Sequence, residues 1–194
     1  MSKFLVQLST ELGLTESERS AFEKHVTEGM PIEPTIVWTK PRPTTLPFEV
    51  LPPLPSQPSC VDRLPLKSRP GKDPLHDQGY YYCLDYASVM MCLPLLQLNP
   101  NPEVVFDICA APGGKSALAY AMLKPKNMIA NEVIGNRCGA LISNLKRCEI
   151  PATLMSRDTE VLKDNFSETA DIVIVDAPCS GQSLLVKKEA APGC

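Results

Sequence analysis

The stretch VVFDICAAPGGKS, residues 104–116, decides the fold class that this 194-residue sequence predicts. Residues 104–108 are apolar apart from Asp107 and rich in β-branched and aromatic side chains, which is typical of a strand buried on both faces of a parallel sheet. The Pro-Gly-Gly run at 112–114 ends that strand, and residues 116–123 are mostly good helix formers. The sequence therefore predicts a strand, a tight turn and a helix in an α/β domain.

Such a turn brings backbone N–H groups and a helix N-terminus to the carboxyl edge of the sheet, where open α/β folds bind ligands. The loop is not a P-loop, because Cys109 stands where the first glycine is required, and it lacks the G-x-G-x-x-G dinucleotide pattern. Two adjacent glycines let backbone approach a ligand without forming a phosphate cradle. The loop therefore favours a nucleoside cofactor without phosphate, such as S-adenosylmethionine. The alternative is a turn that only packs the helix on the strand.

Composition is ordinary for a soluble globular protein, with 44% hydrophobic and 21% charged residues. No apolar run approaches the ~20 residues of a membrane helix, and the N-terminus lacks the features of a signal peptide, so we expect a cytoplasmic protein without membrane contact. Eight cysteines include no Cys-x-x-Cys pair, so we expect reduced thiols and no metal site. The net charge of −3 gives no global support to nucleic-acid binding, and any basic surface must be local.

The first 30 residues predict two short helices. Gly13 is placed to end the first helix, and a capping box of Thr15 and Glu18 to begin the second. Residues 31–74 hold twelve of the twenty prolines and predict an extended connection, with a strand at 35–39 and a weaker one near 48–51. Four cations in this connection could contact phosphates or form a solvated basic loop: Arg63, Lys67, Arg69 and Lys72.

Downstream, the sequence predicts a strand at 79–84 and a helix at 86–98, in which Pro94 should start a new turn or cause a kink. It then predicts a strand at 127–133, a helix at 136–148, and strands at 152–156 and 171–175. The three tyrosines at 80–82 could stack on bases, but the core is the favoured place for them. Glu132 follows the glycine loop by about 20 residues, a position from which an acid can bind ribose hydroxyls; a surface carboxylate is its alternative. Asp158 is placed to meet an adenine amino group or to form an Asp turn.

Four strings together carry a family resemblance: DICAAPGGKS at 107–116, NEV at 131–133, SRD at 156–158 and VDAPCSG at 175–181. In this order and spacing they resemble the Sun/NOP family of S-adenosylmethionine-dependent RNA (cytosine-5)-methyltransferases. The resemblance is strong over residues 79–181. It implies the α/β fold of a class I methyltransferase, a Rossmann-like parallel sheet in strand order 3-2-1-4. We expect this sheet to be incomplete at the C-terminus and to follow a small N-terminal α+β portion.

The resemblance also implies a domain division and a set of site residues. Residues 1–74 would form an RNA-binding portion, and residues 75–194 the front half of the S-adenosylmethionine domain. The cofactor residues that the family implies are Cys109, Ala110, Ala111, Pro112, Gly113, Gly114, Lys115, Glu132, Asp158 and Asp176. The catalytic residues that it implies are Lys115, which would reach the base pocket, Asp176, and Cys179, which would assist release of methylated RNA.

The chemistry of this family requires a thiolate, because cytosine C5 is a poor nucleophile until a thiolate adds to C6. In the family that cysteine lies in a later Thr-Pro-Cys motif, and the sequence here ends at Cys194 before such a motif. We therefore expect a truncated or split methyltransferase for ribosomal or transfer RNA that catalyses poorly. Two alternatives are a non-catalytic cofactor- or RNA-binding module and a DNA cytosine-5 methyltransferase, whose nucleophile also follows a proline.

Overall fold

The computed structural model describes residues 3–28, 32–98 and 101–177. Described residues up to 32 belong to one compact unit and residues 33–177 to a second. The first unit contains α1 (Lys3–Glu11) and α2 (Glu16–Glu28), which confirms the two predicted helices.

The loop between α1 and α2 follows the predicted capping pattern. Gly13 has φ +63°, the left-handed conformation that suits a residue after a helix. The Thr15 backbone N–H donates to Glu18 Oε2 at 2.9 Å, and the Glu18 N–H donates to Thr15 Oγ1 at 3.4 Å. These reciprocal bonds satisfy donors at the start of α2.

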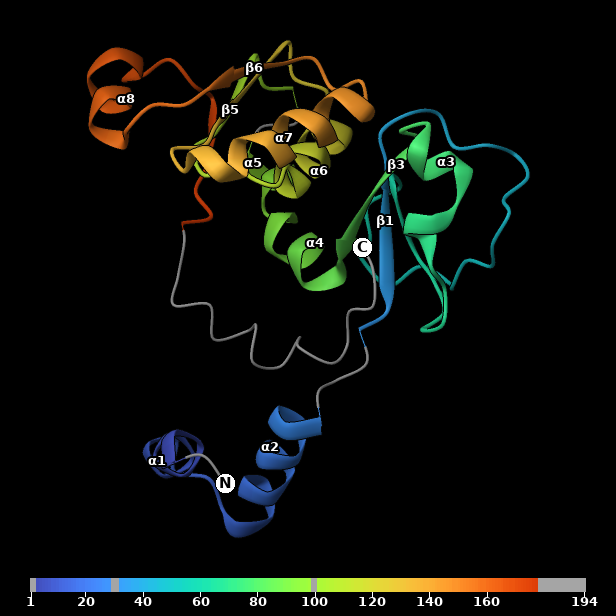
Figure 1. Cartoon of the computed structure of the whole chain (residues 1–194), viewed down its shortest axis with the longest axis vertical. Helices are drawn as coiled ribbons and strands as arrows, with labels where there is room; N and C mark the ends of the chain where they lie inside the picture. Colours follow the sequence, from blue (N-terminus) through green and yellow to red (C-terminus); the bar gives the residue numbers. More distant parts are fainter. Residues whose placement is uncertain (1–2, 29–31, 99–100, 178–194) are drawn as a thin grey trace. The chain divides into compact units, whose positions relative to one another are not determined.

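The second unit is built around a four-stranded parallel sheet (Figure 1). Its strands are β4 (Val104–Asp107), β5 (Asn127–Asn131), β6 (Ala152–Met155) and β7 (Ile172–Ile174). They lie in the order β6-β5-β4-β7, which is the predicted order 3-2-1-4. Three helices connect them: α6 (Gly114–Leu123), α7 (Gly135–Arg147) and α8 (Thr159–Phe166).

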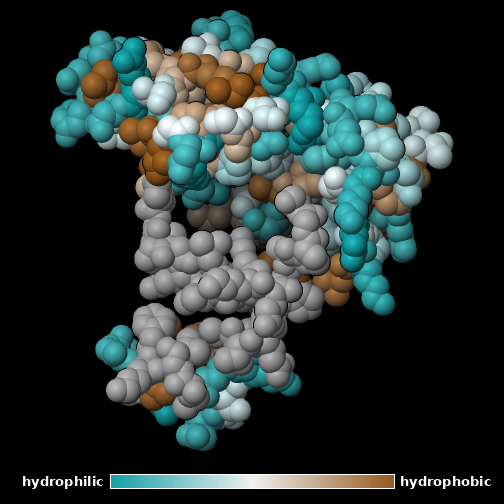
Figure 2. Space-filling view, in the orientation of Figure 1, coloured by the Kyte–Doolittle hydropathy of each residue, from teal (hydrophilic) through white to brown (hydrophobic). Residues whose placement is uncertain are grey.

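Alternate residues of β4 face different helices. Val105 packs in one core cluster with Leu118 of α6, whereas the ring of Phe106 meets Phe166 of α8 edge to face at 5.7 Å. The sheet is therefore covered on both faces, as the apolar sequence of β4 predicts. Figure 2 shows that hydrophobic patches nevertheless reach the surface over the end of the sheet formed by β6.

An antiparallel sheet of three strands precedes the parallel one. It consists of β1 (Pro34–Trp38), β2 (Val61–Arg63) and β3 (Tyr81–Asp85), in the order β2-β1-β3. Short helical segments follow β2 and β3: η1 (Pro70–Lys72), α3 (Pro74–Asp77), α4 (Tyr86–Cys92) and α5 (Leu95–Leu98). Because β3 lies beyond residue 74, the predicted domain boundary runs through this sheet.

Several predictions for this region can be compared with the structure. Two of the three tyrosines belong to the core as favoured, since Tyr81 is fully buried and Tyr82 is 8% exposed, whereas Tyr80 is half-buried at its margin. The weak strand predicted near 48–51 is wrong: no strand is assigned there, and only the Leu51 N–H reaches a strand residue, the carbonyl of Arg63. Prolines on both sides of this segment lack the N–H groups that a ladder needs.

Helix α6 packs between the two sheets. Its residues contact β4 and β5 on one side and β1 and β3 on the other. Half of its ten residues are glycine, alanine or serine, and a Cβ at Gly114 would lie only 2.7 Å from Leu84 Cδ1 of β3. The close approach of the antiparallel sheet to the helix therefore depends on glycine and alanine.

A second close contact joins Gly79, which precedes β3, to the end of α7. The φ of Gly79 is +69°, and a Cβ built on it would lie 1.7 Å from the carbonyl oxygen of Arg147 at the end of α7. The Arg147 side chain in turn donates to the carbonyls of His76 and, at 3.2 Å, Tyr81. The end of α7 is thus fixed against the start of β3.

Replacing Gly79 tests this junction. We expect Gly79→Ala to lower the free energy of unfolding by about 3 kcal/mol, because the methyl group meets backbone and the conformation is left-handed. Gly139→Ala is the matched control, since Gly139 lies in α7 with nothing within 4 Å of its Cβ position. It should stabilise by up to about 1 kcal/mol. Urea denaturation of both variants measures the effects, and equal stabilities would contradict the contact.

Candidate functional site

The carboxyl edge of the parallel sheet begins with a buried acid, Asp107, the last residue of β4. It is 1% exposed, and its Oδ2 accepts a hydrogen bond from Ser116 Oγ of α6 at 2.6 Å. Burial raises the pKa of Asp107 to about 6, although Ser116, the Cys109 backbone N–H and Lys115 act in the opposite direction. Its Oδ1 is buried without a hydrogen-bond partner among the described residues. No motif in the sequence predicts a role for Asp107, whose one signal is that it interrupts an apolar strand.

The loop after β4 uses many of its backbone donors inside the chain. The N–H of Ile108 donates to Ile174 at 3.0 Å, that of Ala110 to Asn131 at 2.8 Å, and that of Gly113 to Ala110 at 2.7 Å. A phosphate-binding loop needs such N–H groups for its ligand. This pattern agrees with the choice of a nucleoside cofactor over a phosphate ligand.

The loop contains all six predicted cofactor residues at 109–114. Ala110, Ala111, Gly113 and Gly114 are buried, Cys109 is half-buried and Pro112 is exposed after a cis peptide bond. The glycines have packing reasons of their own: Gly113 has φ +109° and faces leucines of α7, and Gly114 touches β3. Burial, followed by nearby acids, raises the pKa of the Cys109 thiol, which argues against this cysteine as a nucleophile at neutral pH.

Two side chains of α7 hold this loop. Arg137 Nη2 donates to the carbonyl of Ala111, and Asn144 Nδ2 donates to the carbonyl of Pro112 at 2.9 Å. Tyr82 Oη reaches the same Pro112 carbonyl at 3.4 Å. The helix therefore binds two consecutive carbonyls of the loop, a role that no motif in the sequence indicates.

Glu132 follows β5 and lies beside Arg137. Its side chain is 2% exposed, and Oε1 accepts from the Ile134 N–H at 2.9 Å. Oε2 lies 3.3 Å from Arg137 Nη1 but has no hydrogen bond within the described residues. A buried carboxylate oxygen without a hydrogen bond suits a hydroxyl donor such as a ribose, so this residue fits the predicted nucleoside cofactor.

Asn131, immediately before Glu132, joins three strand ends. Its Nδ2 donates to the carbonyls of Ile108 at 3.0 Å and Arg157 at 3.1 Å, and its Oδ1 accepts from the Arg157 N–H at 2.9 Å. The loops after β4 and β6 are thereby fixed to the end of β5. The sequence signal for this role was the position of Asn131, a polar residue at the end of a buried strand.

Asp158 lies after β6 at the same edge of the sheet. It is the N-cap of α8, and its Oδ1 accepts from the Glu160 N–H at 3.0 Å. The Asp-turn alternative thus describes its local structure. The carboxylate remains exposed, so a contact with adenine stays a prediction.

Lys115 and Asp176 meet across the ends of β4 and β7. Lys115 Nζ lies 2.5 Å from Asp176 Oδ2, and the two side chains are 22% and 56% exposed. The structure therefore brings together two of the three predicted catalytic residues. The third, Cys179, lies outside the described residues, as does the rest of the predicted motif from residue 178 onward.

Among the residues with described positions, no three His, Cys, Asp or Glu side chains gather as a metal site would require. Over the same residues, no helix combines the length and apolar character needed to span a membrane.

Comparison with known proteins identifies the family to which the sequence is similar. The model of the 16S rRNA methyltransferase RsmB/F family matches residues 95–191. Ribosomal RNA small subunit methyltransferase F from Klebsiella pneumoniae (strain 342) is 34% identical over 131 residues, which are 66% of this chain and 26% of that protein. The protein of the same name from Aliivibrio salmonicida (strain LFI1238) is 34% identical over 114 residues, covering 58% and 24%. The chain thus spans about a quarter of the length of these curated relatives.

Solved structures share the fold. The crystal structure of PH0851 matches with a TM-score of 0.72 and 21% identity, over 96% of this chain and 43% of that one. A methyltransferase homolog protein from Pyrococcus horikoshii matches with a TM-score of 0.64 and 20% identity, over 96% and 66%. Together with the strand order, these matches confirm the predicted Rossmann-like α/β fold.

The buried acid Asp107 predicts a pH dependence of stability. Its pKa of about 6 lies above the ordinary 3.8, so the folded chain holds this proton more tightly than the unfolded chain. The stability that it contributes is complete below about pH 4 and is lost as the pH rises through about 6. Relative to Asp107→Asn, the wild type should therefore lose about 3 kcal/mol between about pH 4 and pH 7.

Urea denaturation across this pH range measures the difference. Asp164→Asn, which removes an exposed carboxylate of α8, is the control for the substitution itself. A constant difference for Asp107→Asn would show that this carboxylate does not titrate as its burial implies.

Proposed function

Because the chain belongs to the 16S rRNA methyltransferase RsmB/F family, we propose that it transfers a methyl group from S-adenosylmethionine to C5 of a cytosine in RNA. The observation that carries the proposal is that the family match spans both the glycine loop and the residues around Asp176. The names of the curated relatives favour ribosomal over transfer RNA as the substrate. An RNA substrate of this kind is consistent with a cytoplasmic protein.

The proposed cofactor residues lie along one edge of the sheet. S-adenosylmethionine, when bound, supplies an electrophilic methyl group. We assign the loop 109–115 to its methionine end, Glu132 to its ribose hydroxyls and Asp158 to its adenine. The open Oε2 of Glu132 supports the ribose assignment, and Arg137 supports it further by holding both this carboxylate and the loop.

The proposed catalytic residues are Lys115, Asp176 and Cys179. The ion pair of Lys115 and Asp176 places one cation and one carboxylate beside the loop, where they can orient a cytosine through its ring nitrogen, carbonyl and amino group. Cytosine C5 attacks the methyl group after a thiolate has added to C6, a base then removes the C5 proton, and the thiol leaves. For Cys179 we propose the release of methylated RNA, as the family resemblance implies.

Cofactor binding is the first test. Isothermal titration of the 194-residue chain with S-adenosylmethionine should show binding, and Glu132→Gln should weaken it at least about tenfold, because a charged acceptor for ribose is lost. Glu103→Gln is the control, since Glu103 is an exposed acid paired with Lys126. Absence of binding by a folded sample would refute the cofactor assignment.

A methyl-transfer assay distinguishes an RNA methyltransferase from a DNA methyltransferase and from a non-catalytic module. With radiolabelled S-adenosylmethionine, we expect slow transfer to unmodified small-subunit ribosomal RNA rather than to duplex DNA, and a further loss of about a hundredfold in Lys115→Gln. Greater transfer to DNA would favour the DNA cytosine-5 methyltransferase. Cofactor binding without transfer to either would favour the non-catalytic module.

A further inference from the structure

A cysteine near the start of α7, Cys138, lies at the same sheet edge as the proposed cofactor residues. Its thiol donates to the carbonyl oxygen of Glu132 at 3.3 Å and reaches that of Ile134 at 3.6 Å. On another side, the Cys138 sulfur lies 4.0 Å from the hydroxyl oxygen of Ser156. The thiol is therefore placed between the residue that follows β5 and the residue that follows β6.

A second observation at this place concerns the side chain of Glu132. It is only 2% exposed, and its Oε2 accepts no hydrogen bond within the described part of the chain. A buried acceptor without a donor indicates a ligand that supplies one. The space beside Cys138 is thus the space that we assign to the adenosine part of the cofactor, with ribose at Glu132 and adenine toward Asp158.

Cys138 is also better placed to react than most of the other described cysteines. It is half-buried and not bonded to another cysteine. Burial raises the pKa of four other thiols: Cys60, Cys92, Cys109 and Cys148. Because the thiolate is the species that attacks a disulfide, a raised pKa slows that reaction at neutral pH. Cys83 packs against the aromatic cluster of Trp38 and Tyr81.

We propose that Cys138 is a redox modification site, at which a low-molecular-weight disulfide such as glutathione disulfide blocks the adenosine part of the cofactor site. The Cys138 sulfur forms a bond to one sulfur of the small disulfide, whose S–S bond breaks. The other sulfur leaves as a thiolate, and the proton of Cys138 passes to solvent. Cys138 is thereby oxidised to a mixed disulfide and the leaving half is reduced, and a free thiol reverses the exchange.

The position of the sulfur explains why the modification excludes the cofactor. A disulfide bond is about 2 Å long, so the attached group begins within a few ångströms of both Glu132 and Ser156. It then occupies the space that the adenosine needs. A bound nucleoside must in turn hinder the modification, because the two compete for one place. The inference rests on the proposed function, since it is the proposed cofactor that the modification displaces.

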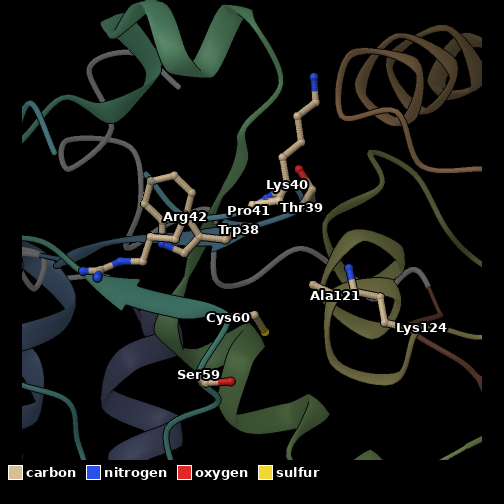
Figure 3. Close-up of a pocket in the computed structure, with 9 residues that line it drawn as sticks. All are labelled: Trp38, Thr39, Lys40, Pro41, Arg42, Ser59, Cys60, Ala121 and Lys124. Atoms are coloured by element: carbon tan, nitrogen blue, oxygen red, sulfur yellow. The ribbon is translucent and has the colours of Figure 1, made fainter. Parts of the chain in front are cut away.

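Cys60 provides a matched thiol away from this edge. It is half-buried like Cys138, and it lines a hollow of about 340 Å³ between the end of β1 and α6. Figure 3 shows Cys60 across this hollow from Ala121 of α6. Ala121 lies seven positions after Gly114, about 10 Å along the helix from the cofactor loop. A ligand at the cofactor edge therefore leaves Cys60 as it is.

The first measurement follows modification of the full 194-residue chain by glutathione disulfide. After free thiols are blocked with N-ethylmaleimide, trypsin releases Cys138 as the one cysteine of peptide 138–146, which mass spectrometry quantifies. S-adenosylhomocysteine at ten times its dissociation constant should slow modification of Cys138 about tenfold, because about a tenth of the chain is then free. The rate at Cys60 should not change. Equal rates at Cys138 with and without the nucleoside would overturn the proposal.

The second measurement is isothermal titration with S-adenosylmethionine before and after the same treatment. The treated wild type should lose binding, and dithiothreitol should restore it. Binding by Cys138→Ser should be unaltered by the treatment, whereas Cys60→Ser should respond as the wild type does. A treated Cys138→Ser variant that loses binding, or a treated wild type that keeps it with Cys138 modified, would contradict the proposal.

The outcome is separable from that of the proposed function. Binding of S-adenosylmethionine that is indifferent to modification of Cys138 would reject the modification site and leave the methyltransferase proposal intact. No binding by the untreated, folded chain would reject the proposed function and, with it, the blocked site.

Discussion

The burial of α6 between two sheets is the constraint on which the second unit depends. The parallel sheet packs on one side of this helix and the antiparallel sheet on the other, so its side chains face apolar neighbours nearly all round. A helix enclosed in this way must be apolar on every face, and small residues let both sheets approach. A larger side chain at Gly114 would meet Leu84 and Tyr82, and would push β3 away from the loop that Tyr82 contacts.

The same helix connects packing with chemistry. Its first turn supplies Ser116 to the buried Asp107 and Lys115 to Asp176, so both acids are oriented by a helix that cannot shift without disturbing two sheets. Helix α7 completes the edge from outside, because Arg137 and Asn144 hold the loop carbonyls. The edge is therefore pre-organised by contacts within the chain, which lowers the ordering cost of binding a ligand there.

The predictable features were those encoded locally. Strand β4, the helix after it, the capping box of α2 and the buried tyrosines follow from short-range patterns, and the strand order from the family resemblance. Features that depend on distant residues were missed: the bonds of Asn131 to two other loops, and the Arg137 contact with Ala111. The packing around Gly113 and Gly114 was also missed: a Cβ at these positions would meet the leucines of α7 and Leu84 of β3, because a sequence does not show what approaches a turn.

The effect of a charged residue likewise depends on which residues the fold places beside it. A net charge of −3 describes the whole sequence, but recognition of a polyanion depends on which charges the fold brings together. Arg63 stands in a basic run and is neutralised by Glu33, thirty positions earlier in the chain. Arg42 has an acidic partner too, yet Asp62 binds only its Nε and so orients the remaining donors. An acid near a cation can therefore remove it from a surface or aim it, and only the geometry of the pair distinguishes the two.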